Sequence, residues 1–348
     1  MGVTLRDVAA RANVSVGTAS MILNGKEREV RISAATRTRV LKVAEELKYQ
    51  PNSFARSLRT QKSNTLGVCA AYLMDPYTAT ILHWANHAAH ARQYKLMLSF
   101  LEEQEEPADA IREIFGKGTV DGILVRESGF LLDDQSIISL HKQGMHMVLI
   151  GREVEGYRIP TVLLDNFRGG WLAAEHLMSL GHKKIGLMMY DHPEMGVKRA
   201  LGAKAALSQA GFDMDQVIER YVTDRAPSDS TERGQDLIAE LLENGERPTA
   251  IIAGADILAF RIIRAITNQG LRVPEDIAVV GFDDMEYISV NFNPPLTSVR
   301  PPYTEMGELG ANLLMDIIEG KTDSEIDNRF VLEPTLVVRE SSDGKNGK

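Results

Sequence analysis

The 348-residue sequence contains a single cysteine, Cys69, and no apolar run long enough to span a bilayer. One cysteine excludes a disulfide framework and a zinc site built from cysteines, and it is typical of a reducing compartment. The N-terminal residues carry no apolar core after their charges, so we expect no secretory signal. We therefore predict a cytoplasmic protein that binds no membrane.

The sequence also lacks the short motifs that mark common catalytic sites. It has no Gly-x-Ser-x-Gly elbow, no P-loop, no His-Glu-x-x-His and no glycine-rich turn with dinucleotide-binding spacing. His83, His87 and His90 have a spacing that can chelate zinc on one helix, but no cysteine or carboxylate completes the set nearby. A solvated or interface face of histidines is the alternative that we favour. We predict that the protein is not an enzyme and holds no cofactor or metal.

Charge is distributed unevenly along the chain. Residues 1–62 contain 12 Lys and Arg against 5 Asp and Glu, whereas the remaining 286 residues contain 27 against 43. A basic segment attached to an acidic body is typical of a nucleic-acid-binding module joined to a domain of another function. A basic face that is merely solvated is the alternative, and charge alone does not separate the two.

The basic segment predicts three short helices with defined starts. Thr4 with Asp7 three residues later is a variant of the capping box, and Ser15 and Ser33 are N-cap residues for two further helices. Asn13 tolerates the left-handed backbone that a tight turn between the first two helices requires. This order describes a helix-turn-helix arrangement, in which the outer face of the second helix enters the major groove.

From Leu66 onward, short apolar runs alternate with longer amphipathic stretches. This alternation, with turn signals at nearly every junction, predicts an α/β fold of parallel sheets with helices on both faces. Up to eight strands exceed one small sheet, so we predict two doubly wound subdomains and a chain that crosses between them more than once. The predicted strands are 66–71, 95–100, 122–125, 147–150, 161–164, 184–189, 250–253 and 277–282.

Ordered motifs from about Thr4 to Val338 resemble the LacI/GalR family of bacterial transcription regulators. In the basic segment they include Thr4-Leu5-Arg6-Asp7-Val8-Ala9, Tyr49-Gln50-Pro51-Asn52 and Ala55-Arg56-Ser57-Leu58. In the body they include Leu180-Gly181-His182-Lys183-Lys184-Ile185, Val273-Pro274-Glu275-Asp276-Ile277 and Gly281-Phe282-Asp283-Asp284. The resemblance implies a three-helix head, a hinge helix and a body like a periplasmic binding protein.

The resemblance further implies a homodimer whose heads bind a pseudo-palindromic operator in double-stranded DNA. It implies that two short hinge helices become ordered on DNA, and that Leu58 inserts into the central base step of the minor groove. Residues 52–59 form at most two helical turns, which are too short to be stable alone. An apolar side chain flanked by Arg56 and Arg59 suits the unstacking of a base step. A leucine that packs on the body is the alternative.

One feature of the second helix departs from the family pattern. The positions that usually read base edges are Val16, Gly17 and Met21 here, and none of them can donate a bidentate hydrogen bond to a base. We therefore expect readout that depends more on DNA shape and on the hinge. The predicted DNA contacts are Thr4, Ser15, Val16, Gly17, Thr18, Ser20, Met21, Asn24, Asn52, Arg56 and Leu58.

A small effector is expected between the two subdomains, because ligands of open parallel sheets bind beyond the carboxyl ends of the strands. Arg199 and Asp283 match an effector-contacting arginine and an acidic residue of the family. Asp256 and Asp284 are equally well explained as helix N-caps, and Tyr190 as a packing residue. The predicted effector contacts are Tyr72, Tyr77, Arg126, Tyr190, Arg199, Asp256 and Asp283.

The predicted domain boundaries follow from these motifs. The head is residues 1–49, the hinge 50–63 and the body 64–340, with a disordered tail at 341–348. Within the body, the N-subdomain comprises about 64–163 and 294–324, and the C-subdomain about 164–293 and 325–340. The tail shows no helix heptads, so a tetramer-forming zipper is not expected.

The leading hypothesis is a sequence-specific transcription regulator, a repressor whose operator affinity is set by a sugar-like or related metabolite. The alternative is a soluble solute-binding or sugar-processing protein of the periplasmic-receptor fold with an incidental basic head.

Overall fold

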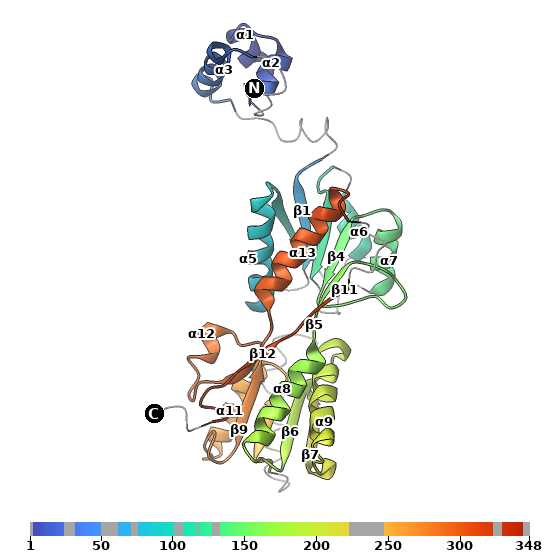
Figure 1. Ribbon diagram of the computed structural model, residues 1–348, viewed down its shortest axis with the longest axis vertical. Helices are drawn as coiled ribbons and strands as arrows, with labels where there is room; N and C mark the ends of the chain where they lie inside the picture. The colour runs from blue at the N-terminus through green and yellow to red at the C-terminus, as the bar shows by residue number, and fades with distance from the viewer. Residues whose placement is uncertain are drawn as a thin grey trace. The chain divides into compact units, whose positions relative to one another are not determined.

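A computed structural model describes residues 3–23, 32–49, 62–70, 76–100, 107–116, 118–126, 133–222, 247–322 and 329–343 (Figure 1). The chain divides into two compact units, a head of Met1–Ser63 and a body of Asn64–Lys348. None of the helices in these ranges is both long and apolar enough to cross a membrane.

The head contains α1 (Leu5–Arg11), α2 (Val16–Leu23) and α3 (Ala34–Glu46). Small and branched side chains from all three helices form its core, because each helix is apolar on one face only. Arg39 Nε donates a hydrogen bond of 2.9 Å to the carbonyl of Ala12, which joins α3 to the end of α1. Asn13 has a φ of 51°, as the predicted tight turn requires. The three predicted helices and their capping residues are confirmed. The buried core residues are Val8, Ala9, Ala12, Ala19, Ile22, Val40, Val43 and Ala44.

The body contains two six-stranded sheets. The first has the order β11-β5-β4-β3-β1-β2 and the second β12-β10-β9-β8-β6-β7. All pairs are parallel except that of β10 with β12. The first-sheet strands are β1 (Thr65–Ala70), β2 (Lys95–Phe100), β3 (Gly122–Arg126), β4 (Met147–Ile150), β5 (Thr161–Leu164) and β11 (Arg329–Leu332). The second-sheet strands are β6 (Ile185–Tyr190), β7 (Val217–Val222), β8 (Ala250–Ala253), β9 (Ala278–Phe282), β10 (Thr297–Arg300) and β12 (Thr335–Val337).

Helices cover both faces of each sheet, because side chains alternate between the faces along every buried strand. On the first sheet, α5 (Pro76–Ala91) and α13 (Tyr303–Ile318) pack on one face, and α6 (Pro107–Ile114) and α7 (Asp134–Lys142) on the other (Figure 1). On the second, α8 (Asn166–Ser179) and α9 (Lys198–Gln209) lie opposite α11 (Asp256–Asn268). The remaining described helices are short: α12 (Glu286–Ser289), η2 (Pro193–Val197) and η3 (Met214–Gln216). The predicted doubly wound α/β architecture is confirmed.

The chain passes between the sheets at places that differ from two of the predicted boundaries. The prediction assigned 294–324 to the N-subdomain, but β10 pairs with β9 in the second sheet, and only the following α13 packs on the first. It assigned 325–340 to the C-subdomain, but β11 pairs with β5 in the first sheet. The predicted boundary lies at Pro294-Pro295, because two consecutive prolines are a turn signal. In the structure, this turn precedes β10, which belongs to the same sheet as the preceding strand β9.

The predicted disordered tail also needs correction at its start. Ser341 and Ser342 are buried, and both bond to the second sheet. Ser341 Oγ accepts from the Thr297 amide at 2.8 Å, and Ser342 Oγ is 2.6 Å from Thr297 Oγ1. The polar composition of 341–348 suggested solvent exposure, but a serine hydroxyl can be buried when it is hydrogen-bonded. Residues 344–348 lie outside the described ranges.

Candidate nucleic-acid interface and ligand site

Ser15 caps the N-terminus of α2. Its Oγ accepts a hydrogen bond of 3.0 Å from the Thr18 amide and is 2.8 Å from the Thr18 hydroxyl. This cap satisfies a backbone donor that would otherwise lack an intrahelical partner. The remaining N-terminal amides and the helix dipole favour an anion such as a backbone phosphate at this end.

One face of α2 is left uncovered by the rest of the head. Val16 is 43% exposed and Gly17 is exposed, whereas Ala19 and Ile22 on the opposite face are buried. A Cβ placed on Gly17 would have only Ser15 Oγ nearby, at 3.7 Å. Ser20 and Met21 are partly exposed. The predicted base-reading positions therefore lie on the accessible part of the helix.

Thr4 and Asp7 form the predicted capping box at the start of α1. The Thr4 amide donates to Asp7 Oδ2 at 2.8 Å, and the Asp7 amide donates to Thr4 Oγ1 at 3.4 Å. The hydrogen bonds from Thr4 hold the pKa of Asp7 below its usual value. The predicted contacts Asn24, Asn52, Arg56 and Leu58 lie outside the described residues.

In the body, the carboxyl ends of both sheets are joined by a series of side-chain contacts. Arg126, at the end of β3, lies over the ring of Tyr77 with its Cζ 5.2 Å from the ring centroid. Tyr77 stacks on Tyr303 at a centroid distance of 5.5 Å. The Tyr303 hydroxyl donates to Asp283 Oδ1 at 2.9 Å, and Asp283 Oδ1 is 4.0 Å from Arg199 Nη1. These five residues, which we call the interlobe series, bring together four of the predicted effector contacts.

Arg199 is held firmly at the second-sheet end of the interlobe series. Its Nε donates to Asn166 Oδ1 at 2.8 Å, its Nη1 donates to the carbonyl of Gly254, and its Cζ lies 3.4 Å from the centroid of the Phe282 ring. α8 approaches α9 closely here, since a Cβ on Gly170 would lie 1.8 Å from the Arg199 carbonyl oxygen. Such fixed geometry suits a residue that positions a ligand.

Asp283 and Tyr303 link the second sheet to a helix of the first. Asp283 has a φ of 112°, a region that side chains rarely adopt, and its amide donates to the Val299 carbonyl at 2.9 Å. Burial and the neighbouring Asp283 carboxylate raise the pKa of Tyr303 well above its usual value, so its hydroxyl remains a donor. Sequence reasoning missed Tyr303, although its place at the start of α13, directly after a chain crossing, was a usable signal.

Arg126 differs from Arg199 in having an unsatisfied donor. The residue is only 8% exposed, and its Nε is buried without a hydrogen-bond partner. Within the described ranges, no ion pair involves its guanidinium. A Cβ on Gly151 would lie 3.3 Å from Arg126 Nη1, so the guanidinium also lies against the backbone that follows β4.

Asp256 is removed from the predicted effector contacts, because it is fully buried and bonded to the chain itself. It accepts hydrogen bonds from Ser298 Oγ at 2.6 Å, Ser289 Oγ at 3.0 Å and the Met285 amide at 3.1 Å. Burial raises the pKa of Asp256 to about 6 despite these bonds. It is not an N-cap either, since the cap residue of α11 is Ala255.

Asp284, the other proposed N-cap, instead forms ion pairs. Its side chain is fully buried, and its Oδ2 is 2.5 Å from Arg300 Nε and its Oδ1 2.6 Å from Arg339 Nη1. Tyr190 is half-buried and packs against the α11 side of the second sheet, in line with its packing interpretation. Tyr72 lies outside the described residues.

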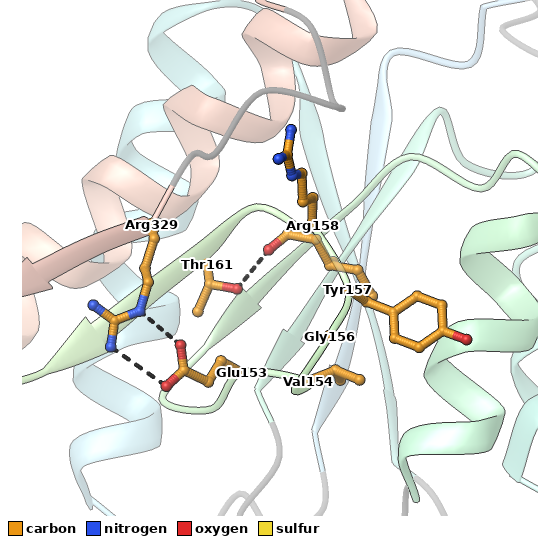
Figure 2. A pocket seen from close by; sticks show the side chains of 8 residues that line it. Glu153, Val154, Gly156, Tyr157, Arg158, Thr161 and Arg329 are labelled. Carbon is orange, nitrogen blue, oxygen red and sulfur yellow. Dashed lines mark hydrogen bonds and ion pairs between the residues drawn. The ribbon is translucent and has the colours of Figure 1, made fainter.

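A separate cavity of about 300 Å³ lies beside β5 and β11, and none of the predicted effector contacts lines it (Figure 2). Arg329 and Glu153 form an ion pair across it at 2.6 Å. Its lining residues are Glu153, Val154, Gly156, Tyr157, Arg158, Ile159, Thr161 and Arg329.

The three histidines of α5 are exposed, and two of them lie beside the ring of Trp84. His83 and His87 make edge contacts with its ring at centroid distances of 5.4 and 5.5 Å. His87 Nδ1 is 3.8 Å from Glu308 Oε1 on α13. In the part of the chain that the structure describes, no group of three His, Cys, Asp or Glu side chains is arranged to hold a metal.

Comparison with known proteins places these features in one family. Residues 4–52 match the model of bacterial regulatory proteins of the lacI family, and residues 174–342 match the periplasmic binding protein-like domain. The chain is 33% identical to the HTH-type transcriptional repressor PurR of Erwinia tasmaniensis, over 97% of this chain and 96% of that protein. It is 29% identical to the ribose operon repressor of Haemophilus influenzae, over 97% and 98%. These relatives are transcriptional repressors, which are not enzymes.

A solved structure extends the match to both units of the chain. The lac repressor dimer bound to operator and the anti-inducer ONPF covers 98% of this chain and 99% of its own, with a TM-score of 0.84 and 27% identity. Three observations indicate the same family: the capped helices of the head, the two doubly wound sheets and the sequence matches. The chain belongs to the lacI family of bacterial regulatory proteins.

Proposed function

We propose that this chain is a repressor that binds a pseudo-palindromic operator as a homodimer, with an affinity set by a small effector bound between the two sheets. The observation that carries the proposal is the coexistence of two features. One is a basic head with an uncovered α2 face. The other is the interlobe series, which gathers polar side chains where both sheets end.

For the head, we assign base contact to Val16, Gly17 and Met21, and phosphate or base-edge contact to Thr4, Ser15, Thr18, Ser20 and Asn24, of which Asn24 lies outside the described residues. Val16 and Met21 can contact thymine methyl groups but cannot form bidentate hydrogen bonds. Specificity then depends on the hinge residues Asn52, Arg56 and Leu58, with Leu58 unstacking the central base step. Binding to operator DNA assigns the protein to the cytoplasm.

For the body, Arg126, Tyr77, Asp283 and Arg199 are the effector contacts. Because the interlobe series includes side chains of both sheets, a ligand bound there interacts with both and changes their relative orientation. The same ligand then changes operator affinity by a coupling free energy of about 1–3 kcal/mol.

We propose that two copies of the chain contact each other through an apolar patch on and near α11, a helix that packs on the second sheet. Ile257 and Phe260 of α11 and Val290 are 44%, 46% and 49% exposed, and Phe260 packs edge-on against Phe292 at 5.6 Å. Large exposed apolar groups that cluster in this way mark interaction surfaces. Phe260→Glu should convert the dimer to monomer in sedimentation, whereas Tyr157→Glu, at an exposed aromatic elsewhere, should not.

The test of the proposed function is operator binding by the full chain. In a mobility-shift assay with fragments upstream of its own gene and the adjacent genes, we expect tight binding to a palindromic site that weakens steeply with salt, because the head neutralises several phosphates. Binding that is absent or insensitive to salt would favour the alternative, a solute-binding protein with an incidental basic head.

A further inference from the structure

Arg126 occupies an unusual electrostatic position in the body. Taking a guanidinium out of water is costly unless the charge is paired and hydrogen-bonded. Arg126 is 8% exposed, yet its Nε has no hydrogen-bond partner and no carboxylate within the described ranges forms an ion pair with it. Among the described residues, Arg126 interacts with the Tyr77 ring, and an interaction of this kind offsets only part of the cost of burying a charge.

The other charges at the carboxyl ends of the sheets are already compensated. Arg199 donates to Asn166 and Gly254 and lies 4.0 Å from Asp283. Asp283 also accepts from Tyr303. Arg126 is therefore the cation of the interlobe series that has a buried donor, Nε, without a hydrogen-bond partner.

The shape around Arg126 favours a planar or tetrahedral oxyanion. The Tyr77 ring lies beside the guanidinium, with its centroid 5.2 Å from Arg126 Cζ, and the backbone of Gly151 lies close to Nη1. The donors of an arginine lie in the plane of the guanidinium and match two oxygens of a carboxylate or phosphate. A neutral sugar hydroxyl would leave the buried charge uncompensated.

We propose that the effector carries an acidic group, a carboxylate or a phosphate ester, which binds the Arg126 guanidinium edge-on. This inference rests on the proposed effector site and assigns the class of ligand that the site takes. The rest of the effector then extends along the interlobe series toward Tyr77, Asp283 and Arg199.

The test measures the thermal unfolding temperature of the full chain, and it needs no knowledge of the effector. Sodium phosphate and sodium acetate serve as separate probes, each against sodium chloride of equal ionic strength. Three proteins are compared: the wild type, Arg126→Met and Arg272→Met. Arg272 is an exposed arginine that pairs with Asp276 at 3.1 Å, outside the interlobe series, so its replacement controls for general anion binding.

We expect phosphate, acetate or both to raise the unfolding temperature of the wild type and Arg272→Met by about 3 °C, from the relation between ligand saturation and stability. The Arg126→Met protein should show no such rise. A larger response to phosphate assigns a phosphate ester, and a larger response to acetate assigns a carboxylate. Equal responses of all three proteins, or none in the wild type, would overturn the proposal.

The same melts without added oxyanion give a second criterion. Arg126→Met should unfold at a temperature equal to or above that of the wild type, because it removes an uncompensated buried charge and keeps most of the side-chain volume. If Arg126→Met fails to fold or melts several degrees lower, Arg126 serves the ligand-free fold and the proposal is wrong. Operator binding by the wild type is measured separately. If the wild type binds operator but responds to neither anion, only the proposed ligand class is wrong. If the wild type binds no operator, the proposed function is wrong.

Discussion

The two sheets of the body share one strand order but differ in how their carboxyl ends are compensated. Strands β1 to β5 and β11 of the first sheet correspond in order to β6 to β10 and β12 of the second. In the second, Asp256 accepts three hydrogen bonds and Asp284 has two arginine partners. In the first, Arg126 has a buried donor without a partner. One topology therefore carries an end whose acids pair with partners in the chain, which we call the saturated end although Asp284 Oδ1 accepts no hydrogen bond, and an end whose buried arginine lacks an ion pair among the described residues.

The largest expected effect tests the saturated end. Asp256→Ala should lower the free energy of unfolding by about 3–5 kcal/mol, because it leaves the buried Ser298 hydroxyl and the Met285 amide without an acceptor and removes one of the two acceptors of the Ser289 hydroxyl. Chemical denaturation measures the change. Asp276→Asn, which alters an acid that pairs with Arg272 near the opposite end of the same sheet, should cost much less, because solvent screens an exposed ion pair. Similar losses in both variants would contradict a special role for Asp256.

The next effect is the pH dependence of stability that arises from the Asp256 carboxyl group. Burial raises the pKa of Asp256 to about 6 from an ordinary 3.8, so the folded state binds more protons than the unfolded state between these values. The contribution of Asp256 to the free energy of unfolding therefore falls as the pH rises from about 4 to 6, by about 3 kcal/mol in all. Subtracting the pH profile of Asp256→Asn from that of the wild type isolates this slope. A flat difference would show that the carboxylate is ionised in the fold at pH 4.

A smaller effect concerns the contact between the two sheets. Tyr303→Phe removes the hydrogen bond to Asp283 while leaving the ring stacked on Tyr77. We expect a loss of about 1–2 kcal/mol in stability, as for a hydrogen bond to a charged acceptor. Tyr94→Phe, at a buried tyrosine of the first sheet's own core, is the matched control. If Tyr303→Phe lowers stability no more than Tyr94→Phe does, the hydrogen bond of Tyr303 does not stabilise the contact between the sheets.

The smallest effect lies in the head. Gly17→Ala should raise the stability of the head by about 0.5–1 kcal/mol, because alanine favours a helix and the added Cβ meets only Ser15 Oγ at 3.7 Å. If Gly17 faces bases, the same methyl group changes the operator preference. Selection from random DNA with both proteins measures that preference, and identical selected sequences would place Gly17 outside the readout.

The sequence predicted those parts of the structure that depend on local rules. Helix caps such as Thr4 and Ser15, and buried strands such as 147–150 and 250–253, follow from side-chain chemistry and periodicity. The strands β7, β10, β11 and β12 were missed. β7, β11 and β12 are edge strands and β10 lies next to an edge, and such strands gain their stability from partners that are distant in the sequence. The contrast between Asp256 and Arg126 was missed for the same reason, since both were predicted as ligand contacts and only three-dimensional packing shows which one has partners.

The measurement that tests the central claim most directly is selection of operator DNA by the intact protein. Genomic fragments are bound, recovered and sequenced over several rounds at two salt concentrations. The account predicts enrichment of a palindromic site near a small set of promoters, with weaker recovery at higher salt. Recovered fragments that match the input library at both salt concentrations would contradict a head that reads duplex DNA under the control of the two-sheet body.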